Sequence, residues 1–333
     1  MSDTLSQGQA NLGHGWDNRT VSEETLGTVG EFGVIDRVTA QVGSSAYVLL
    51  GPGDDAAHIA TADGTFVVSA DILIEGKHFR RDWSSPTEIG RKAAAVNLSD
   101  INAMGGVATA LTVAFAAPRD LPVVWAAEMA AGFEAECAKV GAHLVGGDLA
   151  EADSIIISVT AFGDAENVIT RSGARPGDVL AYAGQLGVAS AGYAALSRGF
   201  RSPKAAVDAH RVPEPPYASG PAAARAGATA MTDISDGFLA DVGNIAAASH
   251  VAIDIDPTKF EVPEPVETVG SALGGVDPMR FILTGGDDYA LAATFGPDAT
   301  LPEGWTVVGT VREGAGVTVA GEVPRGTLGH TAF

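Results

Sequence analysis

The sequence has few cysteines and few basic residues. Cys137 is the one cysteine in 333 residues, so no disulfide can form within the chain. This use of cysteine fits a reducing compartment, and we expect a cytoplasmic protein. Only 20 Lys and Arg stand against 41 Asp and Glu, which gives a net charge of −21. Binding to nucleic-acid phosphates needs a basic face, so this balance argues against a nucleic-acid partner.

Long apolar runs are also missing. The longest mostly apolar stretch, "GGVATALTVAFAAP" at residues 105–118, is too short to cross a bilayer and ends in proline. No basic flank followed by an apolar stretch is found near the start, so no signal peptide is visible and we expect no membrane partner. Hydrophobic residues still make up 46% of the chain, enough for a sizeable core. The length suggests two domains.

Several familiar catalytic motifs are absent from the sequence. No GxxxxGK[ST] segment is present, which excludes a P-loop protein. The lack of CxxC and the scatter of the seven histidines argue against zinc. No GxSxG segment is present, and no Ser, His and Asp follow one another in a hydrolase order. "DISDG" at residues 233–237 is not an EF-hand loop, because its glycine leads straight into an apolar helical pattern.

Strand and helix patterns alternate along the chain, which predicts a mixed α/β (α+β) fold. After residue 163 the pattern starts again, so we expect two similar halves with a boundary near 163–170. Residues 1–28 are polar without an apolar period, and we expect them to form a flexible N-terminal tail. Strands are predicted in the first half at residues 46–50, 65–70, 108–116, 142–146 and 154–162.

The clearest predicted helix starts at Pro86. Ser85 can cap it and Glu88 can close a capping box, while Gly105 marks the end. Asn97 and Asp100 fall on one face of this helix, together with Met104. An acid near a helix C-terminus is electrostatically unfavourable, which makes Asp100 a candidate for a functional role.

Aspartates recur where an apolar strand meets small residues. For a single turn the structural explanation is sufficient, because Asp and Gly favour turns. Repetition at several strand ends indicates a site, because α/β proteins build sites there. Crowded carboxylates repel unless cations compensate, and Mg²⁺ shares its ligands among carboxylates, water and phosphates. The sequence therefore predicts a Mg²⁺–phosphate site. With Asp100, the acids are Asp54, Asp55, Asp71, Asp148, Asp233, Asp236, Asp287 and Asp288.

Seven motifs occur in the order seen in thiamine-monophosphate kinases, and the chain resembles this family from about residue 30 to its end. Each motif alone is weak, but seven in order with suitable spacing form a specific signal. "GEFGVIDR" at residues 30–37 also resembles the start of that family. The seven motifs are "GDDAA" (53–57), "SADILIEGKHF" (69–79), "AVNLSDINAMGG" (95–106), "VGGD" (145–148), "TRSGARPGD" (170–178), "DISDG" (233–237) and "TGGDDYAL" (284–291).

The resemblance implies a two-domain fold like that of aminoimidazole-ribonucleotide synthetase, with the N-terminal sheets pairing across a homodimer. Residues 29–165 would form the N-terminal domain, which binds ATP and Mg²⁺ and dimerises, and residues 166–333 the C-terminal α/β domain. The implied reaction converts ATP and thiamine monophosphate into ADP and thiamine diphosphate, with several Mg²⁺ ions.

The resemblance also implies roles for individual residues. The expected metal ligands are Asp55, Asp71, Asp100, Asp148, Asp233 and Asp236, with Ser69 and Ala70 in the same metal-binding turn as Asp71. The expected contacts to ATP are Gly147, Asp148, Arg171 and Ser235. The expected contacts to the thiamine end of the substrate are His78, Asp287 and His330.

No general base is needed for this reaction. The attacking phosphate of the substrate has its second pKa near ~6 and is largely dianionic at neutral pH. The obstacle is repulsion between two anions, which costs about 4 kcal/mol for unit charges ~4 Å apart at an effective dielectric of 20. Metal ions would offset this repulsion, and Arg171 could add positive charge at the transferred group.

Three positions depart from the family pattern and keep alternatives open. Asp287 replaces the usual Glu, Ala70 replaces a Thr and can bind metal only through its carbonyl, and His330 stands where an aromatic residue is usual.

One alternative is a superfamily sibling, an ATP-dependent purine-pathway synthetase or a selenophosphate synthetase, although the latter usually carries a reactive cysteine near its start. Another is a catalytically impaired Mg·ATP-binding homologue. A third is a haloacid-dehalogenase-type phosphatase, because "VAIDIDPT" (251–258) fits a DxDxT strand end.

Overall fold

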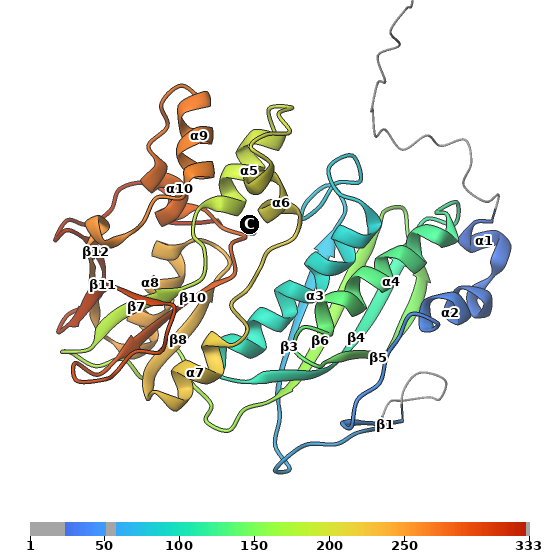
Figure 1. Ribbon diagram of the computed structural model, residues 1–333, viewed down its shortest axis with the longest axis horizontal. Coiled ribbons are helices and arrows are strands. Elements are labelled where there is room, and N and C mark those ends of the chain that lie inside the picture. Colours follow the sequence, from blue (N-terminus) through green and yellow to red (C-terminus); the bar gives the residue numbers. More distant parts are fainter. Residues whose placement is uncertain (1–23, 51–57, 331–333) are drawn as a thin grey trace, which may run out of the picture.

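Two main β-sheets, each carrying helices, organise the chain in the computed structural model, which describes residues 24–50 and 58–330 (Figure 1). The first sheet has four strands in the order β3-β6-β4-β5, and the second has six in the order β12-β9-β11-β7-β10-β8. The mixed α/β fold expected from the sequence is confirmed. Within the described residues, no helix combines the length and the apolar character needed to cross a membrane.

The first sheet carries two helices on one face. Strands β3, β6 and β4 are antiparallel, and β4 and β5 are parallel, joined by a crossover through α4. Helices α3 and α4 lie side by side over this sheet (Figure 1). Their close approach depends on Gly90, where a Cβ atom would lie 1.9 Å from the Met129 carbonyl oxygen. The elements are β3 (Val67–Ile74), α3 (Pro86–Ala103), β4 (Val107–Ala117), α4 (Val123–Cys137), β5 (His143–Glu151) and β6 (Ile156–Asp164).

The second sheet belongs to the C-terminal half, whose core centres on α8 and the strands beneath it. Strands and helices alternate again in this half, as expected from the pattern after residue 163; its helices include α6, α7, α9 and α10, which the sequence pattern did not single out. The elements are β7 (Val179–Ala183), α5 (Val188–Leu196), α6 (Lys204–Arg211), α7 (Ser219–Arg225), β8 (Ala228–Ile234), α8 (Phe238–Ser249), β9 (Ala252–Ile255), a 3₁₀ turn η1 (Pro257–Lys259), α9 (Glu264–Ala272), α10 (Pro278–Thr284), β10 (Ala290–Phe295), β11 (Trp305–Arg312) and β12 (Gly316–Val319).

The N-terminal segment is ordered earlier than expected. Helix α1 (Leu26–Val29) begins inside the region predicted as a tail, because Thr25 and Thr28 form a capping box. Helix α2 (Glu31–Thr39) follows and packs on α4, and β1 (Val48–Leu50) pairs with β2 (His58–Ile59). The expected tail over residues 1–28 is therefore too long at its C-terminal end. Sheet strands end at residue 164 and resume at residue 179, while the exact domain boundary stays a prediction.

Helix α3 has the predicted start and end. Ser85 Oγ accepts the Glu88 N–H at 3.3 Å, and Glu88 Oε2 accepts the Ser85 N–H at 2.7 Å. Pro86 occupies the first turn, and Gly105 follows the helix with φ +78°. The capping box and the terminal glycine fix both ends of the helix, and hence the position of every side chain along it.

Helix α3 also forms the seam between the two halves of the chain (Figure 1). One side of the helix packs on the first sheet, and the other side bonds to the C-terminal half. Asn102 Nδ2 donates to the Pro216 carbonyl at 3.1 Å, and its Oδ1 accepts the Gly220 N–H at 3.0 Å. Any residue of α3 that points between the two halves is therefore placed to take part in a site shared by both.

Candidate active site

Strand β3 and helix α3 bring together the first group of predicted ligands. Ser69 and Asp71 alternate along β3 and point toward α3, since every second residue of a strand shares a face. Ser69 Oγ donates to Asp100 Oδ2 at 2.5 Å, and the Asp71 N–H donates to Asn97 Oδ1 at 3.1 Å. The predicted shared face of Asn97 and Asp100 is therefore turned toward the acidic strand.

The C-terminal half adds a further acid to this group. Asp233 lies near the end of β8 with 4% of its surface exposed, and its Oδ2 accepts a hydrogen bond from Ser99 Oγ at 3.0 Å. Ser99 is fully buried on α3, so this bond joins the two halves. The structure thus brings acids from three elements, β3, α3 and β8, into one neighbourhood.

Burial and repulsion perturb these carboxyl groups. Burial, and then the charge of Asp233, raises the pKa of Asp100 to about 7. Burial, and then the charge of Asp241, raises the pKa of Asp233 to about 6. Burial also raises the pKa of Asp71. The Arg171 guanidinium acts in the opposite direction on the pKa values of Asp100 and Asp233. Perturbed acids that gather in this way are typical of functional sites.

The acidic turn after β8 is held by its own helix. Asp241 Oδ2, on the first turn of α8, accepts the N–H groups of Asp236 and Gly237, both at 3.0 Å. Arg171 is oriented by a bond from its Nε to Thr232 Oγ1 at 3.1 Å. These contacts place the predicted ligand Asp236 and the predicted phosphate contact Arg171 beside the turn that also contains Ser235.

The predicted thiamine contacts lie beside the acidic group. Partial burial lowers the pKa of His78, while the charge of Asp287 raises it, and Lys92, Asp71 and His330 also act on it. His78, Asp287 and His330 therefore share one electrostatic neighbourhood, although they are far apart in the sequence. The His330 backbone N–H donates to the Asp236 carbonyl at 2.9 Å, which ties the chain end to the acidic turn.

Asp288, next to Asp287, has a structural role. Its two carboxylate oxygens accept the N–H groups of Gly187 at 2.6 Å and Ala189 at 2.9 Å, at the start of α5. Burial raises the pKa of Asp288 to about 7. Asp288 thus anchors helix α5 to the turn that presents Asp287.

Two predicted residues lie away from this group within the chain. Gly147 lies in the same cross-sheet row as Asp71, but β3 and β5 are the two outer strands of the sheet. Gly147 is therefore three strand spacings, about 14 Å, from Asp71 across the sheet. Asp148, one residue further, is exposed on the sheet face opposite to that of Asp71. The side chain of Ala70 is also on that opposite face.

Other predicted ligands lack a ready-made cation site. Asp55 and its neighbour Asp54 lie outside the described residues. In residues 24–50 and 58–330, no three His, Cys, Asp or Glu side chains are grouped closely enough to hold a metal ion as they stand. The oxygen donors are gathered, but among the described residues they are not yet arranged around a cation position.

Sequence reasoning missed four residues of this region: Lys92, Ser99, His210 and Asp241. The sequence motifs indicate acids at strand ends, whereas Lys92 and Ser99 lie inside a helix. Their spacing of seven residues puts them on one helix face, two turns apart. That periodicity was the available signal, and it identifies the side of α3 that faces the C-terminal half.

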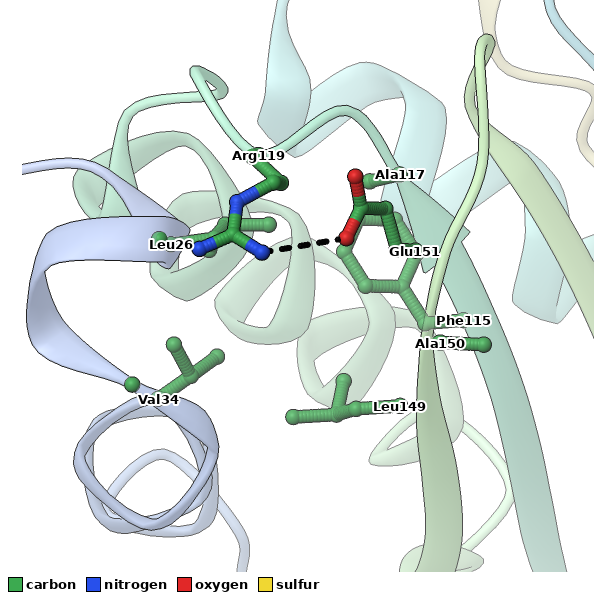
Figure 2. A pocket seen from close by; sticks show the side chains of 10 residues that line it. Leu26, Val34, Phe115, Ala117, Arg119, Leu149, Ala150 and Glu151 are labelled. Carbon is green, nitrogen blue, oxygen red and sulfur yellow. Dashed lines mark hydrogen bonds and ion pairs between the residues drawn. The ribbon is translucent and has the colours of Figure 1, made fainter.

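A separate pocket of about 310 Å³ lies between α1, α2 and the strands β4 and β5. Figure 2 shows Arg119 and Glu151 facing each other at this pocket, with Val34 and Leu149 below them in this view. Arg119 Nη1 and Glu151 Oε2 are 3.3 Å apart. The lining is mostly apolar, and it contains none of the predicted site residues.

The DxDxT-like segment has a structural explanation. Asp254 Oδ1 accepts the Thr318 hydroxyl at 2.6 Å, and Asp256 Oδ1 accepts the Thr258 N–H at 3.0 Å. Both acids are thus used to join β9 to β12 and to cap η1. This arrangement does not favour the phosphatase alternative.

Comparison with known families defines the class of this protein. The model of the AIR synthase related protein N-terminal domain matches residues 53–165, and that of the AIR synthase related protein C-terminal domain matches residues 175–321. The two-domain fold is thus that of an AIR synthase related protein.

Within this class the relatives point to one family. A thiamine-monophosphate kinase of Mycobacterium tuberculosis is 45% identical over 313 residues, which is 93% of this chain and 93% of that protein. The crystal structure of thiamine-monophosphate kinase from Stenotrophomonas maltophilia K279a has a TM-score of 0.77 at 32% identity, and covers 89% of this chain and 98% of that one. A structure described as AaThiL complexed with AMPPCP and TMP has a TM-score of 0.75 at 28% identity, over 91% and 98% of the two chains. The chain belongs to the thiamine-monophosphate kinase family, as the seven motifs indicated.

Proposed function

We propose that this protein transfers the terminal phosphoryl group of ATP to thiamine monophosphate, which yields ADP and thiamine diphosphate. The observation that carries the proposal is the meeting of acids from β3, α3 and β8 beside Arg171, next to His78 and Asp287. The relatives named as thiamine-monophosphate kinases support the choice of substrate, and the solved relative with AMPPCP and TMP supports ATP as the co-substrate.

The donor chemistry of the acidic group fits Mg²⁺. All of its donors are oxygens, and its carboxyl groups have pKa values raised by burial and mutual repulsion, a cost that a cation would relieve. Ser69, Asp71, Asp100, Asp233 and Asp236 would hold the ions, with Asp55 as a further ligand. Bound Mg²⁺ would compensate the negative charge of the two phosphates.

The residues of the chain supply orientation and charge. Arg171, held by Thr232, directs its guanidinium toward the phosphates at the acidic group. Ser235 is the ATP contact on the turn that Asp241 fixes. His78 and Asp287 receive the thiamine end, with His330 beside them. No general base is assigned, because the acceptor phosphate is already largely dianionic at neutral pH.

We also propose that the protein acts as a homodimer through the sheet face opposite to α3 and α4. On that face Val68 and Ile72 are 55% and 49% exposed. Packing two such sheets against each other would bury these side chains. Because β3 and β5 are opposite edges of the sheet, a two-fold partner can bring its β5 edge to this β3 edge. Asp148 of the partner subunit would then complete the ATP site.

The reaction is tested by ³¹P NMR on the purified protein with ATP, Mg²⁺ and thiamine monophosphate, with an EDTA control. We expect metal-dependent thiamine diphosphate and an equal amount of ADP. Asp71→Asn should abolish the product, while Asp153→Asn, at an exposed position, serves as the matched control. ADP with free phosphate, or bound Mg·ATP without turnover, would favour a sibling synthetase or an impaired homologue.

The shared site is tested by mixing two inactive variants, Asp71→Asn and Asp148→Asn. If one protomer supplies Asp71 and its partner Asp148, each mixed dimer has one intact site. Random reassortment of equal amounts then restores about a quarter of the wild-type activity. No recovery after unfolding and joint refolding, with wild-type protein recovering fully, would contradict the shared site.

A further inference from the structure

A buried lysine lies behind the carboxylate assigned to the thiamine end. Lys92, on α3, is 3% exposed. Its Nζ donates to Asp287 Oδ2 at 2.9 Å and to the His210 carbonyl at 3.3 Å. A buried ammonium group is costly unless it is paired, so its position depends on Asp287. The proposed reaction so far assigns Lys92 no role.

The imidazole ring of His210 also lies near Asp287 Oδ2. It is 7% exposed, and its Nδ1 lies 3.6 Å from Asp287 Oδ2, too far for a hydrogen bond. That nitrogen is buried and finds no hydrogen-bond partner among the described residues. The ring is fixed by Trp83 and Tyr193, with centroid distances of 5.9 and 5.5 Å. Burial, and then the charge of Lys92, lowers the pKa of His210 to about 3, so it is neutral.

The backbone holds Asp287 in a fixed orientation. Its φ of +68° lies in the left-handed region, which Asp tolerates better than most residues, and its N–H donates to the Ser235 carbonyl at 2.9 Å. The side chain is 38% exposed. Oδ2 faces Lys92 and His210, while Oδ1 receives no hydrogen bond from the described part of the chain. Burial acts to raise the pKa of Asp287, but the charge of Lys92 and the hydrogen bond from Lys92 outweigh it and lower that pKa.

We propose that Lys92 is a positioning residue for the phosphate acceptor: held by the His210 carbonyl, it orients Asp287 so that Asp287 Oδ1 accepts an N–H from the amino group of the pyrimidine ring. This inference rests on thiamine monophosphate being the substrate. The Lys92–Asp287 pair has no net charge and His210 is neutral. Because the pair has no net charge, it attracts the cationic thiazolium ring only weakly. It can instead accept a directional hydrogen bond from the neutral aminopyrimidine.

The test compares two acceptors, thiamine monophosphate and oxythiamine monophosphate, in which a carbonyl oxygen replaces the amino group. A hydrogen bond to a charged acceptor corresponds to a preference in kcat/KM of about ten- to a hundredfold for the amino substrate. We expect wild type to show this preference and Asp287→Asn to lose most of it. Lys92→Met should raise KM for thiamine monophosphate and reduce the preference, with KM for ATP within about twofold of wild type. Lys92→Arg should restore part of the preference, and Lys259→Met, at an exposed position, should behave like wild type.

Two results would overturn the inference. One is a Lys92→Met enzyme with lower kcat for both acceptors and an unchanged preference, which would place Lys92 at the phosphoryl transfer. The other is equal calorimetric affinity of wild type for the two acceptors. Calorimetry also separates this inference from the proposed reaction, because it does not need turnover. If Lys92→Met does not fold, Lys92→Gln carries the same comparison.

Discussion

The buried, neutral His210 predicts a loss of folding stability on mild acidification. Its pKa is lowered from the usual 6.5 to about 3 in the folded protein, mainly by burial. Below pH 6.5 the unfolded chain binds a proton that the folded chain does not bind. The contribution of His210 to stability is therefore complete above pH 6.5, and it is lost as the pH falls toward 3. Between pH 7 and pH 5 the loss amounts to about 2 kcal/mol.

The measurement is urea unfolding at pH 7 and pH 5 without ligands, followed by tryptophan fluorescence, to which Trp83 next to His210 contributes. Other groups titrate in this range, so the test uses variants. His210→Asn lacks the titrating ring, and its free energy of unfolding should fall by about 2 kcal/mol less than that of wild type. His250→Asn is the control, because His250 is exposed and its φ of +56° suits Asn. Equal pH dependence of His210→Asn and wild type would refute the reasoning.

Three further predictions concern single contacts. Ser99→Ala removes the hydrogen bond to the buried Asp233 carboxylate, which is worth roughly 1.5–3 kcal/mol. Steady-state kinetics should therefore show kcat/KM for ATP reduced at least about tenfold. An unchanged value would mean that Asp233 does not serve the ATP site. Gly147→Ala would put a Cβ atom 2.0 Å from the Val113 carbonyl oxygen, so β4 and β5 must separate and the melting temperature should fall by several degrees, as calorimetry would show. Tyr217→Phe removes a 2.9 Å hydrogen bond to a fully buried carboxylate on α4 and should cost about 1–3 kcal/mol in urea unfolding, with the ring packing retained.

The parts of the fold that depend on short-range patterns could be predicted from the sequence. The start of α3 follows from Ser85, Pro86 and Glu88, three residues whose chemistry specifies a helix N-terminus without any distant contact. Strands such as β6 and β11 follow from runs of β-branched residues. Helices such as α6 and α9 were missed, because each is short and follows a proline (Pro203 and Pro263), which reads as a turn in the sequence.

The candidate site could be predicted only as a set of residue types. The motifs identify the acids, but local sequence does not determine the order of strands in a sheet. It is this order, β3-β6-β4-β5, that puts Gly147 about 14 Å from Asp71 within one chain. The alternation of side chains along a strand could be predicted: Ser69 and Asp71 share one face, and Ala70 lies on the other. Which of the two faces meets α3 depends on packing between distant segments.

The seam along α3 explains why the acids alone gave an incomplete account of the site. A carboxylate at a strand end is recognisable because it breaks an apolar pattern, whereas Lys92 and Ser99 each lie in a helix where polar residues are common. Both become informative through their partners, Asp287 and Asp233, which lie 195 and 134 residues further along the chain. Each pair joins the N-terminal half to the C-terminal half, so the geometry of the site depends on how the halves pack on one helix. A substitution on this side of α3 should therefore alter substrate binding, even where it leaves both β-sheets intact.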